Sequence, residues 1–131
     1  MKTIRGSCEC RAVTFSVEGP LGHTWACHCS QCRKTSGHYW ASTEVPNAQL
    51  KLIKDGGLKW YRSSEQARRG FCVACGPSLF WHEDGEDTIS VGAGTLDDLP
   101  CDATTVVKHI FMSDKGAYYE VTDGLPQSDA W

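Results

Sequence analysis

Seven of the eight cysteines in this 131-residue chain fall into three short groups whose spacing is that of metal ligands. Thiolates are preferred ligands of zinc, and cysteines one or two residues apart let a single segment supply two of them. The candidates are Cys8 and Cys10 in "SCEC", Cys27, Cys29 and Cys32 in "CHCSQC", and Cys72 and Cys75 in "CVAC". The three groups therefore predict zinc binding.

The first and third groups together supply four ligands, which is the number that closes a tetrahedral zinc site. Side chains two positions apart on an extended segment share a face, so Cys8 and Cys10 can bind one ion. Cys72 and Cys75 have zinc-ribbon spacing, and Gly76 directly after them suits a backbone with positive φ. We expect a structural zinc on these four residues. Two alternatives stay open: buried cysteines that pack as small hydrophobes, or a redox pair in the third group, which lacks the βαβ context.

The middle group, here called the cysteine triad, consists of Cys27, Cys29 and Cys32. Its first two members share a face, and the third follows three residues later in a short turn. His28 lies between two ligands and should point the other way, while Cys101 is the one cysteine outside the three groups. Three ligands with an open fourth position are typical of a catalytic zinc. We expect water or a substrate sulfur in that position.

Charge and composition argue against several classes of function. The net charge of −3 and the pI near 5.9 disfavour a nucleic-acid binder, which normally carries a basic excess. No apolar stretch approaches the roughly 20 residues that span a bilayer, and the first residues lack the apolar core of a secretion signal. The expected location is therefore the cytoplasm, where clustered cysteines bind metal or act in catalysis more often than they form disulfides.

The hydrophobic pattern predicts a mainly β fold, with short strands and irregular loops in a single zinc-binding domain over residues 1–131. Leu50–Lys54 and Leu58–Arg62 flank the turn signal "DGG" and predict a hairpin. The only expected helix is one or two turns within "CSQCRKTSG", closed by Gly37. Further strands are expected at Ala12–Val17, Asp87–Gly94, Thr104–Met112 and Ala117–Thr122.

Four segments carry a resemblance to a known family: "GSCECRAVTFSV", "ACHCSQCRKTSG", "ARRGFCVACGPSLF" and "AYYEVTDGLPQ". They resemble the glutathione-dependent formaldehyde-activating family, whose domain also occurs in a centromere protein of type V. The likeness runs from Gly6 to Gln127. It implies several small coiled β-sheets built around zinc, with short helical turns. It also implies a structural zinc on the first and third cysteine groups and a catalytic zinc on the triad.

The resemblance further implies a carbon–sulfur lyase that adds the thiol of glutathione to formaldehyde, giving S-hydroxymethylglutathione. The thiolate is the nucleophile, and a zinc with an open position can deprotonate a thiol or polarise the aldehyde oxygen. Glutathione carries two carboxylates, which suit basic side chains. The candidate substrate-binding residues are Arg33, Lys34, Arg68 and Arg69.

Three alternatives remain beside this interpretation. The four basic side chains can be solvated surface charges. The protein can be a zinc-stabilised module that binds glutathione or a partner without catalysis. A nucleic-acid or chromatin role is the third alternative, and the net charge disfavours it. The sequence leaves the actual thiol and aldehyde, and the oligomeric state, open.

Overall fold

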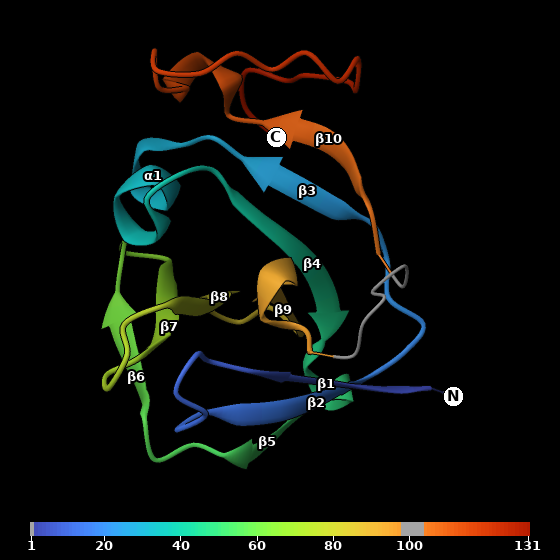
Figure 1. The fold of residues 1–131 in the computed structure, drawn as a ribbon, viewed down its shortest axis with the longest axis vertical. Helices are drawn as coiled ribbons and strands as arrows, with labels where there is room; N and C mark the ends of the chain where they lie inside the picture. Colours follow the sequence, from blue (N-terminus) through green and yellow to red (C-terminus); the bar gives the residue numbers. More distant parts are fainter. Residues whose placement is uncertain (1, 98–103) are drawn as a thin grey trace.

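The computed structural model describes residues 2–97 and 104–131, and within them the fold is mainly β, as the sequence predicts (Figure 1). Ten strands of the described residues form two sheets. The smaller sheet has the order β1 (Thr3–Ser7), β2 (Thr14–Glu18), β5 (Leu50–Lys54). The larger has the order β10 (Val106–Ile110), β3 (Thr24–Cys27), β4 (Trp40–Pro46), β9 (Thr88–Gly92), β8 (Ser78–Glu83), β7 (Ala67–Cys72), β6 (Leu58–Arg62).

The core lies between the two sheets and is built by alternate residues of their strands. Phe15 of β2 and Phe80 of β8 are both buried, with ring centroids 5.1 Å apart in an edge-on arrangement. The ring of Trp60 in β6 stacks on the ring of Phe80, with the two centroids 6.1 Å apart. Burial of each such side chain stabilises the fold by roughly 1.5–3 kcal/mol. Side chains along a strand alternate between the two faces of a sheet, so the residues between these core positions in the large sheet point to its opposite face.

Short helical segments connect the strands. The α-helix α1 (Ser30–Ser36) follows β3, and Gly37 ends it in the left-handed conformation with φ +86°, which confirms the predicted turn. The 3-10 turns are η1 (Asn47–Gln49), η2 (Ala93–Thr95) and η3 (Met112–Asp114). None of the helices in the described ranges is long and apolar enough to cross a membrane.

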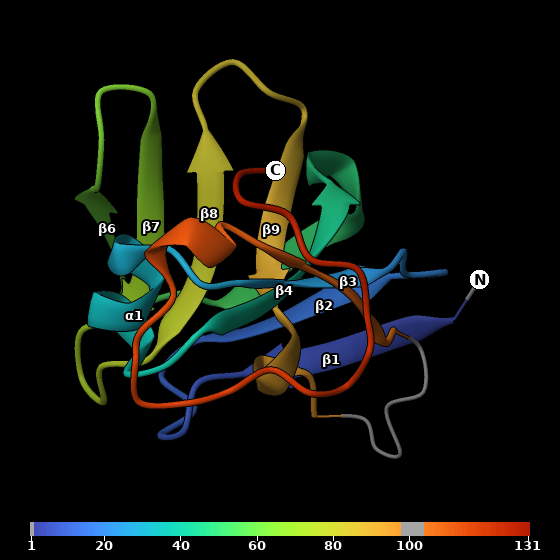
Figure 2. The same cartoon turned by 90° about the horizontal axis from the view of Figure 1, so that it is seen from above.

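The carboxy-terminal segment, residues 112–131, folds back along β10 and past α1 (Figure 2). The amide of His109 donates to the carbonyl of Pro126, and the amide of Ser128 donates to the carbonyl of His109. The predicted strand at Ala117–Thr122 is wrong, because this stretch is irregular. The aromatic content of this stretch suggested the strand. Its tyrosines contact histidine rings instead of taking part in strand pairing.

The predicted hairpin of Leu50–Lys54 and Leu58–Arg62 is also wrong, although both strands have the expected bounds. β5 pairs with β2 in the small sheet, and β6 pairs with β7 in the large one. The turn between them passes from one sheet to the other, with the Gly57 amide donating to the Ala12 carbonyl and the Gly57 carbonyl accepting from Val73. A turn signal predicts a reversal of the chain but does not identify the strand's partner.

Candidate functional site

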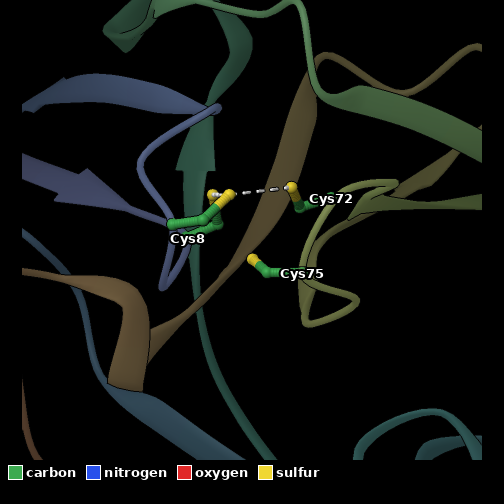
Figure 3. A group of neighbouring side chains, drawn as sticks. Cys8, Cys72 and Cys75 are labelled. Carbon is green, nitrogen blue, oxygen red and sulfur yellow. Dashed lines mark hydrogen bonds between the residues drawn. The ribbon is translucent and has the colours of Figure 1, made fainter.

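The first and third cysteine groups meet beside the core and form a cysteine tetrad of Cys8, Cys10, Cys72 and Cys75. All four sulfurs lie within 4.8 Å of one another, and Figure 3 shows the labelled ones converging. Tetrahedral zinc with bonds of about 2.3 Å separates its sulfurs by about 3.8 Å. The Cys10 sulfur is 3.8 Å from the Cys8 sulfur and 3.8 Å from the Cys72 sulfur. The donor set and its spacing therefore fit zinc.

Two turns, not extended strands, position the tetrad, and in this respect the expectation for Cys8 and Cys10 is wrong. Arg11 has φ +65° and its amide donates to the Cys8 carbonyl, so the chain curls and brings the two sulfurs together. Cys72 ends β7, and the Gly76 amide donates to its carbonyl across the turn that contains Cys75. Gly76 has φ +100°, as its place in the sequence predicts.

The tetrad joins the two sheets. Cys8 follows β1 of the small sheet and Cys72 ends β7 of the large sheet, and both side chains belong to the buried core. Gly57 passes so close that an added Cβ would lie 2.8 Å from the Ala12 Cβ and 3.2 Å from the Cys72 sulfur. A metal bound by these sulfurs would cross-link elements distant in sequence, which is what a structural ion does.

The three triad sulfurs also lie within 4.8 Å of one another. Cys27 ends β3, Cys29 is the N-cap of α1, and Cys32 lies buried in the first turn of that helix. The Cys32 amide donates to the Cys29 sulfur at 3.2 Å. Hydrogen bonds from the Cys27 and Cys32 thiols lower the pKa of Cys29. Hydrogen bonds to Cys29 and Cys32 raise the pKa of Cys27, so the three sulfurs share one negative charge, which is suited to a cation such as zinc.

His28 points away from the triad sulfurs, as the alternation of side chains predicts. Its ring is fully buried, with Nδ1 hydrogen-bonded to the Tyr119 hydroxyl and Nε2 2.8 Å from Nδ1 of His109. Burial lowers the pKa of His28 to about 4, with a further contribution from the charge of His109. Both ring nitrogens have partners, so His28 is not a fourth ligand. Cys101, the other residue considered for that position, lies outside the described residues.

Arg69 is the basic residue that the fold brings to the triad. It is only 6% exposed, and its Nη2 lies 3.5 Å from the Cys32 sulfur. Its Nε donates to the Gln31 side chain at 3.0 Å, and Gln31 in turn donates to the Ser63 carbonyl at 2.8 Å. The Nη1 atom of Arg69 is buried and has no hydrogen-bond partner among the residues that the structure describes. A buried donor without a partner is rare in folded proteins and points to a ligand.

A cavity of about 730 Å³ opens beside the triad, on the face of the large sheet away from the core. Cys27, Cys29 and Cys32 line it together with Arg69. The triad cysteines and Arg69 thus line a space large enough for an organic molecule.

The other predicted substrate-binding residues do not line this cavity. The guanidinium of Arg68 lies 4.0 Å from the ring centroid of Trp60, on the other face of β7. Lys34 is exposed, and Arg33 packs its Cδ near Gly116 of the carboxy-terminal segment. Their role in substrate binding stays a prediction.

Most of the chain matches one family profile. The profile described as glutathione-dependent formaldehyde-activating enzyme matches residues 3–114. The chain belongs to the glutathione-dependent formaldehyde-activating family. A Halomonas elongata protein provisionally named as such an enzyme is 28% identical over 129 residues, covering 90% of this chain and 80% of that protein. A crystal structure of a Rhodobacter sphaeroides protein shares the fold, with a TM-score of 0.61 at 23% identity, over 78% of this chain and 99% of that one.

Membership of the glutathione-dependent formaldehyde-activating family confirms the resemblance seen in the sequence. Two features of the cavity were nevertheless missed. Gln31, which orients Arg69, lies inside "CSQC" but carries no signal of its own. Trp25 and Trp81 line the cavity, and each alternates with buried neighbours, Ala26 and Phe80. That alternation was a readable sign that both tryptophans face away from the core.

Proposed function

We propose that this protein is a zinc-dependent carbon–sulfur lyase that adds a thiol to formaldehyde or a related aldehyde. With glutathione, the thiol in the family's description, the product is S-hydroxymethylglutathione. The reverse reaction breaks the carbon–sulfur bond. One observation carries the proposal: three clustered thiols line a cavity together with a buried arginine, one of whose N–H groups has no hydrogen-bond partner in the described part of the chain.

In this proposal the two cysteine clusters have different tasks. The tetrad supplies four ligands between two sheets and is assigned a structural zinc. The triad supplies three and leaves a fourth position for substrate. Zinc bound there would supply a Lewis acid that lowers the pKa of a thiol and polarises an aldehyde.

Arg69 is assigned the role of stabilising the negative charge that develops on the aldehyde oxygen. When the thiol sulfur bonds to the carbonyl carbon, the π electrons move to oxygen, which then takes a proton. The guanidinium of Arg69, which lines the cavity, can donate to that oxygen, and its hydrogen bond to Gln31 fixes it in advance. The guanidinium also offsets the net charge of −1 that three thiolates leave on Zn²⁺. Arg69 thereby takes the compensating role that the sequence suggested for Arg33 and Lys34.

The test is the rate of thiol addition with protein of measured zinc content. Formaldehyde and thiols combine without a catalyst, so the relevant quantity is the acceleration above the uncatalysed rate. We expect two zinc ions per chain and acceleration that Cys29→Ser abolishes. Glutathione binding without acceleration would identify a non-catalytic binding module instead.

A further inference from the structure

The floor of the cavity is a row of residues directly opposite one another on neighbouring strands. Arg69 of β7 pairs with Trp81 of β8, Trp81 with Ser90 of β9, and Ser90 with Glu44 of β4. All four line the cavity. Strands lie about 4.8 Å apart, so the row runs about 14 Å from Arg69 beside the triad to Glu44. The cavity therefore extends well beyond the thiols.

Aromatic side chains make up much of the cavity wall. Four of the chain's five tryptophans line it, and the fifth, Trp60, packs against the core. Trp131 of the carboxy-terminal segment has its ring centroid 6.5 Å from that of Trp81. The other two are Trp25 and Trp40. Such walls suit a flat, apolar group, because aromatic rings bury large areas and pack at these separations.

The charges that line the cavity are unevenly placed. Arg69, beside the triad, is the one arginine or lysine among the described residues that line it. The carboxylates of Glu44, Glu83 and Asp114 also line it. Among the described residues, a second carboxylate on a bound molecule would thus find three acidic neighbours and one further cation at the wall, Lys108, whose Nζ lies 4.7 Å from the ring centroid of Trp25. Like charges in a partly enclosed site repel.

The aromatic wall and the acidic lining favour a molecule with a ring and without a second carboxylate. Formaldehyde and glutathione fit this description poorly. Formaldehyde has only hydrogen on its carbonyl carbon and leaves the aromatic wall without a partner. Glutathione has two carboxylates, of which Arg69 can bind one. An aldehyde with a ring would place its oxygen at Arg69 and its ring over Trp81. A neutral or hydrogen-donating end would then face Ser90 and Glu44.

We infer that the aldehyde used by this protein is aromatic and carries no carboxylate, its ring lying between Arg69 and Glu44. The inference rests on the proposed function and names the electrophile for the same site. The reaction stays balanced: the sulfur–carbon bond forms, the carbonyl π bond opens, and the proton lost by the thiol ends on the new hydroxyl. No oxidant or reductant is required.

The kinetic test compares formaldehyde, benzaldehyde and 4-carboxybenzaldehyde with one thiol and zinc-loaded protein. Each rate is divided by its own uncatalysed rate, which removes differences in intrinsic reactivity. We expect acceleration of benzaldehyde at least tenfold above that of formaldehyde, and acceleration of 4-carboxybenzaldehyde at least tenfold below that of benzaldehyde. Equal or greater acceleration of formaldehyde would overturn the inference.

Variants locate the effect in the cavity. Trp81→Ala should lower the acceleration of benzaldehyde at least tenfold more than it lowers that of formaldehyde. Tyr61→Ala is the matched control, because Tyr61 pairs with Arg69 on the same face of the sheet but does not line the cavity. Glu44→Gln is a conservative change at an exposed residue, and it should raise the acceleration of 4-carboxybenzaldehyde several-fold. An unchanged preference in both Trp81→Ala and Glu44→Gln would contradict the inference.

A binding experiment separates this inference from the proposed function. Benzyl alcohol, an unreactive analogue, is titrated against the zinc-loaded protein and followed by saturation-transfer NMR. Acceleration of no aldehyde would defeat the proposed function alone. In that case, binding of benzyl alcohol that Trp81→Ala weakens at least fivefold would still support an aromatic site. Binding that is absent, or equal in wild type and Trp81→Ala, would overturn it.

Discussion

The Nε2 atom of His28 lies 2.8 Å from the Nδ1 atom of His109, behind the cysteine triad. His109 Nε2 in turn lies 2.8 Å from a carboxylate oxygen of Asp123. Taken as a neutral ring, His109 donates from Nε2, because the carboxylate can only accept, and it accepts at Nδ1 from His28. His28 then accepts at Nδ1 from the Tyr119 hydroxyl. With both rings neutral every group is paired, and the chain of bonds ties the carboxy-terminal segment to the residue between two triad cysteines.

This connection predicts that His109→Ala destabilises the fold. The substitution leaves the buried Nε2–H of His28 without an acceptor, which costs about 1–3 kcal/mol. Urea unfolding of the zinc-loaded protein measures the change. His23→Ala removes an exposed histidine and should change the free energy of unfolding by less than about 0.5 kcal/mol. Equal unfolding midpoints for His109→Ala and wild type would show that the bond between the two rings carries no stability.

Asp123 predicts a pH dependence of stability. The backbone amide of Leu125 and the ring of His109 donate to this carboxylate and hold its pKa below the ordinary value of 3.8. A lowered pKa means that the unfolded chain binds the proton more readily, so this contribution is present above the ordinary pKa and is lost as the pH falls below it. The free energy of unfolding of wild type should exceed that of Asp123→Asn most near pH 6, and the gap should narrow toward pH 3.

Acid also protonates the cysteine ligands and releases metal, in wild type and variant alike. The difference between the two proteins is therefore the informative quantity. A gap that stays constant or widens toward pH 3 would contradict the role given to the Asp123 carboxylate.

The two cysteine clusters should respond differently to the loss of one ligand. Cys75→Ser removes a ligand from a site that links two sheets, so we expect a loss of at least about 3 kcal/mol, or about 10 °C in melting temperature for a chain of this size. Cys29→Ser alters a site formed by one short segment and should lower the melting temperature much less while abolishing activity. Thermal unfolding with zinc analysis measures both. If the two variants unfold alike, the triad is structural.

The clustering of the candidate metal ligands was largely predictable, because it follows from their local spacing. The spacing of Cys27, Cys29 and Cys32 puts three sulfurs on one short segment whatever the rest of the chain does. Predicting the tetrad required joining two pairs of cysteines that are distant in sequence. The number of ligands that a tetrahedral zinc site needs suggested that pairing. The partner of Leu50–Lys54 was not predictable in this way, since strand pairing depends on elements distant in sequence.

The basic residues illustrate the same limit. Arg68 and Arg69 are neighbours in sequence, and their side chains lie on opposite faces of β7. Deciding which of them faces the triad required knowing which face of β7 packs on the core. Phe71 and Gly70 follow without a clear alternation, because the register shifts between these two residues. The sequence thus reduced the basic residues near the cysteines to a few candidates. The arrangement of the sheet shows that Arg69 is the one beside the triad.

Arg69 gives the sharpest prediction for catalysis. Arg69→Met removes the guanidinium that is proposed to donate to the aldehyde oxygen, and loss of one such donor typically lowers the rate about 10²–10³-fold. Zinc content should stay at two ions per chain, because no ligand is changed. Arg62→Met is the matched control, since its exposed guanidinium bonds only to Asp84 among the described side chains. Arg69→Lys keeps the charge but loses the planar fork, so it should recover only part of the rate. Activity of Arg69→Met within threefold of wild type, with full zinc content, would remove Arg69 from the mechanism.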